Sequence, residues 1–477
     1  MLCFKHFGYA TYCLPDTNNF NTYNKKQKES LRITMRGIVQ QQIDNTVNKF
    51  TGKTGKEKNE RIKMGNIDIA ATSEFFLWHT WFSDVFENGG FDIVIGNPPY
   101  IDSETMVRIM PTLRELYTKQ FSSASGNWDM FVVFIELGIK LLKVNGIFCN
   151  IIPNKLIAAK YGIELRNYIS VKNIIEIRDY SRIDVFTNAA VYPVTILMRN
   201  GLSDENSRFT IMNDIVTQKQ TNVTSHATLA SNNYWDMFFV DSNVYNIIVK
   251  INKHSRLSNL FVNVLGAATV ADAYEIKKMI KEQEADTHGL KFVNSGTIDP
   301  FTSLWGIKDC RYIKGKYSKP VISQTDLKNY SETRYLQSIS PKIIVASMTT
   351  RYEAFLDIDG DFVAGKSTTI IIGSLDYLCF LAAIINSKLA SYWLNVVFNS
   401  LKMSGGAINV GKNELQMLPI PEKTDIFKEL INNIVAIKKE NSKADTSSLE
   451  HEIDLLVYDL YGLTKEERLI VDPNYKE

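Results

Sequence analysis

Cysteine is scarce in this chain of 477 residues and never occurs in a closely spaced pair. The sequence therefore suggests neither a zinc site nor a disulfide framework, and scattered cysteines fit a reducing compartment. No apolar run approaches the roughly 18 residues that a membrane helix needs. The N-terminus also lacks a basic segment followed by an apolar one, so it does not resemble a secretory signal. We expect a cytoplasmic protein with no membrane span and no metal site.

A strong net charge is missing as well. The 54 basic and 52 acidic side chains leave a formal net charge of +2, so no global field favours nucleic acid. Any DNA-binding surface must therefore be local. Hydrophobic residues make up 45% of the chain and charged residues 22%, which is typical of a folded globular protein. At this length we expect more than one domain, because a single core rarely grows so large.

The patterns along the chain predict four parts. Residues 1–66 form a polar, basic N-terminal segment, for which a solvated helix and loop are favoured over a DNA-binding arm. In residues 67–215, apolar runs alternate with helical patterns, which indicates an α/β domain with a parallel or mixed sheet. Residues 216–425 contain short strand-like runs separated by turns, and residues 426–477 carry apolar stripes at helical spacing.

The expected elements follow from these patterns. We expect strands at 91–95, 147–152, 174–177, 191–198, 342–345, 354–358 and 368–372. We expect helices at 128–143, 162–172 and 376–397 and a helical tail at 424–470, in which Gly462 ends one helix and Thr464 with Glu467 caps the last. The strand at 91–95 is expected to be buried. Ligands of such sheets bind beyond the carboxyl ends of the strands, so the loop after residue 95 is the expected site.

This loop consists of Asn97, Pro98, Pro99 and Tyr100, which suit methyl transfer to the exocyclic amine of adenine. That nitrogen is a weak nucleophile because its lone pair is delocalised into the ring. An Asn oxygen and a backbone carbonyl can accept its two hydrogens and so localise the lone pair. The prolines stiffen the loop, the aromatic ring can stack on a base that has left the duplex, and positioning does most of the work. A rigid Asn-Pro turn with no catalytic role is the alternative.

The segment 91–100 resembles the catalytic motif of amino-methylating DNA methyltransferases. Residues 128–131, 141–146 and 151–155 are similar to the next conserved block of that family, and residues 185–194 to a later block whose aromatic residue packs on the flipped base. By this match Phe186 is the second stacking residue, with a plain core position as its alternative. Lys155 is a candidate contact to a phosphate, with a solvated surface lysine as its alternative.

Residues from about 290 to 425 resemble the specificity domain of the TaqI-like branch, which also occurs in single-chain restriction–modification enzymes of the Eco57I-like type. Loops with lysines, hydroxyls and glycines can contact phosphates and groove edges, where phosphate contacts position the protein and base contacts specify the sequence. Any one of these residues has a plain surface position as its alternative. The candidates for DNA contacts are Arg351, Lys366, Ser367, Lys402, Ser404, Lys412 and Asn413.

The family binds S-adenosylmethionine with a glycine-rich turn after its first strand, and no such segment precedes Phe91. The resemblance covers roughly residues 75 to 470. It implies a partial Rossmann-like methyltransferase sheet, an α+β DNA-recognition domain and C-terminal helices. It also implies an adenine-specific methyltransferase of a restriction–modification system, acting with S-adenosylmethionine on double-stranded DNA with a flipped adenine.

Three interpretations stay open. The first is an enzyme completed by an upstream piece or by a partner methyltransferase or restriction subunit. The second is a DNA-binding fragment that transfers nothing. The third is a degenerate gene product whose incomplete sheet exposes an apolar edge.

Overall fold

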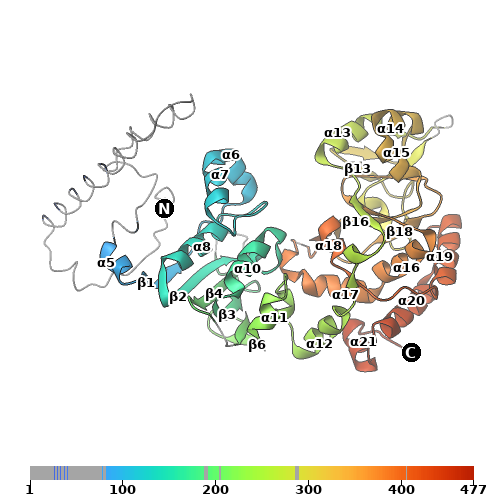
Figure 1. Ribbon diagram of the computed structural model, residues 1–477. Coiled ribbons are helices and arrows are strands. Elements are labelled where there is room, and N and C mark those ends of the chain that lie inside the picture. Colours follow the sequence, from blue (N-terminus) through green and yellow to red (C-terminus); the bar gives the residue numbers. More distant parts are fainter. Residues whose placement is uncertain are drawn as a thin grey trace. The chain divides into compact units, whose positions relative to one another are not determined.

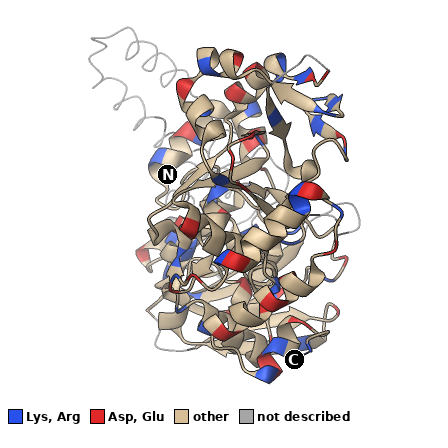
Figure 2. Ribbon diagram, turned by 90° about the vertical axis from the view of Figure 1, so that its right-hand side faces the viewer, with Lys and Arg blue, Asp and Glu red and all other residues tan. Residues whose placement is uncertain are grey.

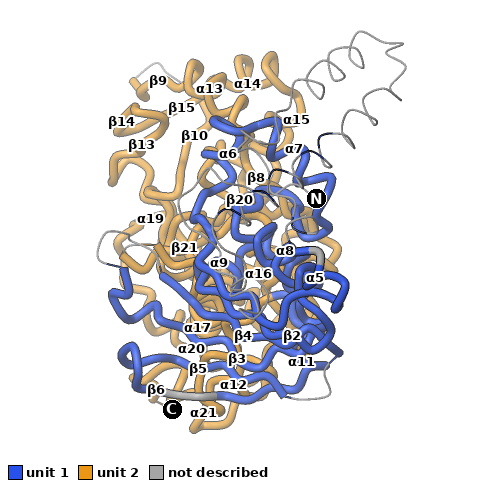
Figure 3. Tube along the Cα trace, turned by 90° about the vertical axis from the view of Figure 1, so that its left-hand side faces the viewer, with its two compact units in different colours: residues 1–233 blue, residues 234–477 orange. Residues whose placement is uncertain are grey.

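The computed structural model describes residues 82–186, 192–202, 206–284, 289–403 and 405–476, with the single residues 26, 30, 33, 37, 40 and 78. The expected N-terminal segment 1–66 therefore lies almost wholly outside the described residues, as does the candidate Ser404. The chain divides into two compact units, residues 1–233 and residues 234–477 (Figure 3). The C-terminal helices belong to the second unit.

A six-stranded mixed sheet forms the core of the first unit, in the order β1-β2-β4-β3-β5-β6 (Figure 1). Its pairs β1/β2 and β3/β5 are parallel, and β2/β4, β3/β4 and β5/β6 are antiparallel. The expected α/β class with a mixed sheet is thus confirmed for this unit. The strands are β1 (Phe91–Gly96), β2 (Leu142–Pro153), β3 (Asn173–Asp179), β4 (Pro193–Arg199), β5 (Ser207–Met212) and β6 (Gln218–Thr224).

Helices cover this sheet, with α8 packed against β1 and β2 and α10 against β3. Gly138 of α8 allows the close approach, because a Cβ there would lie 2.5 Å from the ring of Phe148. The helices are α5 (Ser83–Glu87), α6 (Ser103–Ile109), α7 (Pro111–Gln120), α8 (Phe131–Leu141), α9 (Lys155–Ala158), η1 (Lys160–Gly162), α10 (Ile163–Ser170) and α11 (His226–Ala230).

Two expectations about this unit are wrong in detail. The helix expected at 128–143 ends at Leu141, because Leu142 already begins β2. Asn145 continues that strand with a φ of 63°, a left-handed conformation that Asn tolerates better than most residues. The strand expected to be buried at 91–95 is also half open, since Ile93 and Ile95 are 52% and 56% exposed. β1 is the end strand among the described strands of the sheet, so fewer described elements cover it.

The second unit contains two four-stranded sheets, ordered β19-β10-β15-β9 and β18-β16-β20-β8, and short two-stranded pairs. The strands of the two sheets are β8 (Asn263–Gly266), β9 (Lys281–Glu282), β10 (Leu290–Val293), β15 (Pro320–Ile322), β16 (Lys342–Ala346), β18 (Ala354–Asp357), β19 (Phe362–Ala364) and β20 (Thr368–Ile372). The short pairs are β7 (Ser255–Arg256) with β22 (Pro419–Ile420), β11 (Ile298–Asp299) with β12 (Thr302–Ser303), β13 (Cys310–Tyr312) with β14 (Gly315–Tyr317), and β17 (Met348–Thr349) with β21 (Ile408–Asn409).

Helices complete the second unit. The α-helices are α12 (Ser242–Ile251), α13 (Val270–Met279), α14 (Gln324–Tyr330), α15 (Glu332–Ile339), α16 (Leu375–Asn386), α17 (Lys388–Val397), α18 (Lys412–Gln416), α19 (Lys428–Glu440), α20 (Ser447–Leu460) and α21 (Lys465–Val471). The short 3₁₀ helices are η2 (Asp236–Phe239), η3 (Leu257–Asn259), η4 (Ser295–Thr297) and η5 (Asn399–Leu401). The expected capping box of Thr464 and Glu467 is present, and Gly462 has a φ of 65° after α20.

The single helix expected at 376–397 is wrong. It is broken into α16 and α17, which meet at 61°, and the side chain of Ser387 caps the second helix by accepting from the Ala390 N–H. Serine is common at the start of a helix because its side-chain oxygen accepts a hydrogen bond from a backbone N–H that has no partner within the helix. Among the described helices none is long and apolar enough to cross a membrane alone, although this bent pair reaches that length together. Most of the apolar side chains of both helices are buried in the unit.

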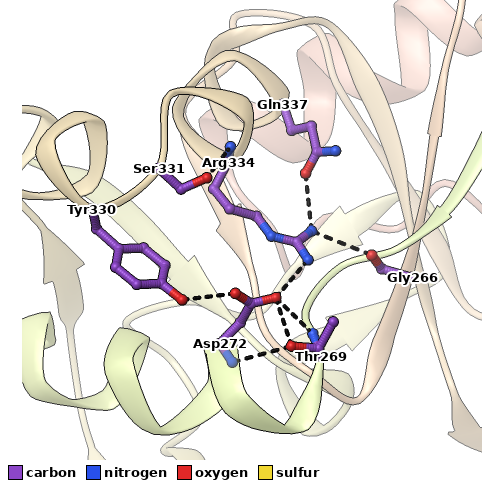
Figure 4. Close-up of polar contacts among 7 residues, drawn as sticks. All are labelled: Gly266, Thr269, Asp272, Tyr330, Ser331, Arg334 and Gln337. Carbon is purple, nitrogen blue, oxygen red and sulfur yellow. Dashed lines mark hydrogen bonds and ion pairs between the residues drawn. The ribbon is translucent and has the colours of Figure 1, made fainter.

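Asp272, at the start of α13, ties this helix to α14 and α15 (Figure 4). Its carboxylate accepts from the Tyr330 hydroxyl at 2.7 Å and from Arg334 at 2.8 Å, and it completes a capping box with Thr269. These hydrogen bonds, the Tyr330 bond foremost, hold the pKa of Asp272 well below its ordinary value. The three helices are therefore locked together beside the core that holds Phe292 and Tyr312.

Candidate functional site

The loop Asn97–Tyr100 leaves the carboxyl end of β1, as the sequence predicted. Gly96 lets it pass close to β2, because a Cβ at residue 96 would lie 2.8 Å from Oδ1 of the buried Asn150. Pro98 is buried, whereas Asn97 is exposed. No hydrogen bond joins the Asn97 side chain to another residue of the described ranges, so its amide can turn toward a ligand.

The structure brings the two proposed stacking residues together. The rings of Tyr100 and Phe186 lie 6.2 Å apart between centroids and meet edge to face at 81°. The Tyr100 hydroxyl donates to the carbonyl of Ile151 in β2 at 3.3 Å. Burial raises the pKa of Tyr100 to about 12, so the phenol stays neutral and keeps its proton for that bond. An edge contact of this kind is a favoured aromatic geometry and limits how either ring can turn.

Asp129, just before α8, holds the chain that follows the loop. Its buried carboxylate accepts from the Ser103 N–H at 3.1 Å, from the Tyr161 hydroxyl at 2.6 Å and from Nζ of Lys155 at 3.3 Å. The Met130 N–H also donates to the carbonyl of Ile101 at 2.9 Å. Sequence reasoning missed this anchor, although Asp129 stands in the block that resembles the family. Lys155, the proposed phosphate contact, is paired with Asp129 and is still half exposed.

The described residues do not form a site for S-adenosylmethionine of the expected kind. Gly89 and Gly90 are the glycines nearest to β1 on its N-terminal side, with φ values of 94° and 122°. A Cβ at Gly90 would lie 2.6 Å from the carbonyl of Leu141, so this glycine serves a close backbone approach to the start of β2. Within the ranges the structure describes, no cluster of His, Cys, Asp or Glu is suited to a metal ion.

In the second unit, three of the segments with proposed DNA contacts converge. The Ser347 N–H donates to the carbonyl of Ser367 at 3.1 Å, and the Val410 N–H donates to the carbonyl of Ser347 at 2.6 Å. β17 and β21 pair beside these bonds. These hydrogen bonds therefore connect three segments into one surface: the loop with Lys366 and Ser367, the turn before Arg351 and the chain before Lys412.

The candidates on this surface differ in how much charge they offer. Arg351 pairs with Asp299 at 3.4 Å and with Glu353 at 3.6 Å, so two carboxylates already balance it. Lys402 is half-buried, and this burial lowers its pKa. Lys366, Ser367, Lys412 and Asn413 are exposed. Figure 2 shows basic and acidic residues interspersed along the ribbon, in keeping with the small net charge.

Comparison with known proteins supports one class of protein. Residues 19–186 match the family model of the Eco57I restriction-modification methylase, so the resemblance begins earlier than the expected residue 75. The type II restriction enzyme and methyltransferase RM.Eco57I of Escherichia coli is 28% identical over 204 residues, which are 41% of this chain and 20% of that protein. The type II methyltransferase M.PaeR7I of Pseudomonas aeruginosa is 21% identical, over 81% of this chain and 73% of its own length.

A putative type II restriction enzyme and methyltransferase of Methanocaldococcus jannaschii, RM.MjaORFECS2P, is 22% identical over 86% of this chain and 35% of its own length. The chain thus spans about a fifth to a third of the first curated relatives it matches. Among solved structures, the Type IIL restriction-modification enzyme MmeI in complex with DNA has a TM-score of 0.47 at 12% identity, over 84% of this chain and 58% of that one.

These sequence matches support a place for the chain among the methyltransferases of restriction–modification systems. Within that class they support the Eco57I-type methylase family, whose model covers the segment with the Asn97–Tyr100 loop and Phe186.

Proposed function

We propose that this chain is the base-binding and DNA-recognising part of an S-adenosylmethionine-dependent methyltransferase. Its substrate is the exocyclic amine of an adenine flipped out of double-stranded DNA, and it serves a restriction–modification system. The observation that carries the proposal is the contact between Tyr100 and Phe186 beside the exposed Asn97 at the end of β1. Two aromatic rings and a free amide at one point are the groups that a flipped base needs.

Each residue of the loop has a role in this proposal. The flipped adenine stacks on Tyr100, and Phe186 packs against the edge of that ring and fixes its orientation. The side-chain oxygen of Asn97 accepts one amine hydrogen and a proline carbonyl of the loop accepts the other. Asp129 is a positioning residue, because it holds the Ser103 N–H at 3.1 Å and so limits movement of the chain after Tyr100.

The donor site lies outside the described residues in this proposal. β1 is the end strand among the described strands of its sheet, and its Ile93 and Ile95 are exposed. An open edge with apolar side chains is a ready surface for strand pairing. We infer that donor-binding strands pair with β1 there, carried by another part of the same protein or by a partner chain.

The same open edge favours a second candidate function. Without added strands, the chain is a DNA-recognition fragment that keeps the base pocket and transfers nothing. Calorimetric titration with S-adenosylmethionine separates the two. Binding by the isolated chain supports the enzyme and contradicts the placement of the donor site on other strands. A folded chain that binds DNA but no donor, with or without a partner chain, supports the fragment.

Asn97→Ala tests the base site in the chain assembled with its donor-binding partner. We expect methyl transfer to fall by about 100-fold or more, since Asn97 acts on the reacting amine, while the affinity for DNA stays the same. Mass spectrometry of the nucleosides from a methylated duplex measures the product, which we expect to be methylated adenine.

Asn167→Ala is the matched control, because Asn167 is an exposed residue on α10. A normal rate for Asn97→Ala would remove the loop from the reaction. Methylated cytosine as the product would contradict the proposed base.

A further inference from the structure

A hollow of about 570 Å³ lies in the second unit where the β13–β14 hairpin faces the loop between β19 and β20. The proposed function uses only its edge, through Lys366 and Ser367. Among the described residues that line the hollow, four are basic and none is acidic. Its lining residues are Asn294, Arg311, Tyr312, Ile313, Lys314, Gly315, Lys316, Lys366 and Ser367.

The basic side chains of the hairpin stand in an unfavourable arrangement. Arg311 and Lys316 face each other as direct partners across the two strands. Like charges at such positions destabilise a hairpin. Asp309, outside the hollow, pairs with Lys316 at 2.8 Å and offsets part of this repulsion. No described carboxylate pairs with Arg311 or Lys314, and both side chains are exposed. An anion in the hollow would relieve the remaining repulsion.

The turn of the hairpin, which carries Lys314, has a strained backbone. Ile313 and Lys314 have φ values of 40° and 61°, in the left-handed region that two-residue hairpin turns require. Asn and Gly are the residues that favour such a turn, whereas a β-branched residue there is strained. Strained backbone of this kind collects at functional sites, where another requirement selects the side chain.

Asn294 joins the two segments that line the hollow, the β13–β14 hairpin and the loop with Lys366. The side chain of Asn294 donates from Nδ2 to the carbonyl of Arg311 at 3.1 Å and accepts at Oδ1 from the Ser367 N–H, also at 3.1 Å. Gly365 permits this approach, because a Cβ there would lie 2.9 Å from Oδ1 of Asn294. The hairpin and the Lys366 loop therefore keep a fixed spacing before any ligand arrives.

Tyr312 lines the hollow with a buried side chain. Its ring is buried against Phe292, with centroids 4.8 Å apart. The hydroxyl lies near the backbone of Lys366 but completes no hydrogen bond with a described residue. Burial raises the pKa of Tyr312 to about 12, so the group remains a neutral donor. The hydroxyl oxygen itself is buried, so Tyr312 shapes the hollow and the exposed cations supply its ligand contacts.

We propose that this hollow binds a phosphate of the DNA backbone, with Lys314, Arg311 and Lys366 as its cationic contacts. This inference rests on the proposed function, because it takes DNA as the ligand. It assigns the β13–β14 hairpin, which sequence reasoning did not single out, to the DNA interface. Such a contact sets the register of the protein on the duplex and carries no base preference.

The test is the binding of a fluorescent duplex of mixed sequence to the full chain, measured by anisotropy between about 50 and 200 mM salt. With Lys314→Ala and Lys366→Ala combined, we expect affinity to fall by about tenfold and the slope of log affinity against log salt to fall by about two. Lys443→Ala, an exposed lysine before α20, is the control and should change neither.

A second variant separates binding from folding. Ile313→Asn with Lys314→Gly provides the residues that this turn favours, so the hairpin should persist. We expect a weaker salt slope, lower by about one, with an undiminished melting temperature.

Three outcomes overturn this inference. A double variant with the wild-type slope and affinity removes the hollow from the interface and leaves the proposed function standing. Lower affinity at an unchanged slope means that the contact is not to a phosphate. A wild-type chain that binds no duplex at any of these salt concentrations overturns the DNA part of the proposed function as well.

Discussion

β1 in the first unit and β16 in the second are similar apolar strands with opposite surroundings. β16 is paired on both sides, by β18 and β20, and all five of its residues are buried. β1 pairs with β2 alone among the described strands and exposes Ile93 and Ile95. The difference extends to charge, since β16 buries the pair Lys342–Asp357 while β1 keeps Asp92 and Lys143 at the surface. An apolar strand is thus part of the core in the second unit, whereas in the first unit it leaves apolar side chains exposed.

Breaking the buried pair should have the largest effect. Lys342 and Asp357 are 1% and 2% exposed, and Lys342→Ala leaves a buried carboxylate without its cation. We expect the free energy of unfolding of the second unit to fall by about 3–5 kcal/mol. Chemical denaturation of the full chain, followed by fluorescence, measures it.

Lys143→Ala is the matched control at the surface of the first unit. Its partner Asp92 is exposed, so we expect no measurable change in stability. Equal losses in the two variants would contradict the contrast between the two strands. Adding Asp357→Asn to the Lys342 variant removes the isolated charge but keeps an acceptor for the Asp361 and Phe362 N–H groups, so a recovery of stability would show that the charge caused the loss.

Two buried carboxyls, Glu136 in the first unit and Asp454 in the second, should contribute to stability with opposite dependence on pH. Burial alone would raise the pKa of Glu136 in the first unit, but hydrogen bonds from Lys140 and Ser123 hold it below its ordinary 4.5. This contribution to stability is present above that value and is lost as the pH falls. In the second unit, burial raises the pKa of Asp454 from 3.8 to about 6. Its contribution is present below 3.8 and is lost as the pH rises through about 6.

Two substitutions check these signs by thermal melting across this range of pH. Asp454→Asn keeps the acceptor for the Lys388 N–H, which lies 2.8 Å away, and should stabilise the second unit at neutral pH but not in acid. Glu136→Gln should destabilise the first unit at neutral pH and lose that effect in acid. If the melting temperatures of both variants and of the wild type depend on pH in the same way, these two carboxyls do not cause the pH dependence of stability.

The smallest expected effect comes from removing one methylene in each strand. Ile343→Val in β16 should lower the free energy of unfolding by about 0.5–1.5 kcal/mol, because the side chain is fully buried. Ile95→Val in β1 should have almost no effect on the isolated chain, since Ile95 is 56% exposed. If donor-binding strands cover β1, Ile95→Val should weaken their binding to this chain. If the variant instead lowers only the free energy of unfolding of the isolated chain, the edge of β1 is not open.

Local patterns predicted much of this fold. The strands at 342–346, 354–357 and 368–372 lie where their apolar runs placed them, and the capping box of Thr464 and Glu467 is formed. Caps and strand ends depend on neighbouring residues, so the local sequence suffices for them. The break at Ser387 was missed because both halves of the helix are apolar, and a bend there depends on packing.

The loop Asn97–Tyr100 and the surface segments around Lys366 could be proposed from residue types alone, because their chemistry is specific. The hairpin with Lys314 and the anchor Asp129 could not be proposed in this way. The basic residues of the hairpin are ordinary in the sequence, and they gain meaning only because Asn294 holds them opposite Lys366.

The sequence by itself determined the order of the apolar strands and led to the proposed chemistry, since the residue types of the Asn97–Tyr100 loop and the apolar runs are local properties. Only the tertiary structure decided which apolar strand is a core, which lysines share a hollow, and that Phe186 meets Tyr100. Burial and proximity depend on what the rest of the chain places beside a residue. Segments far apart in sequence set that environment, and no local pattern records it.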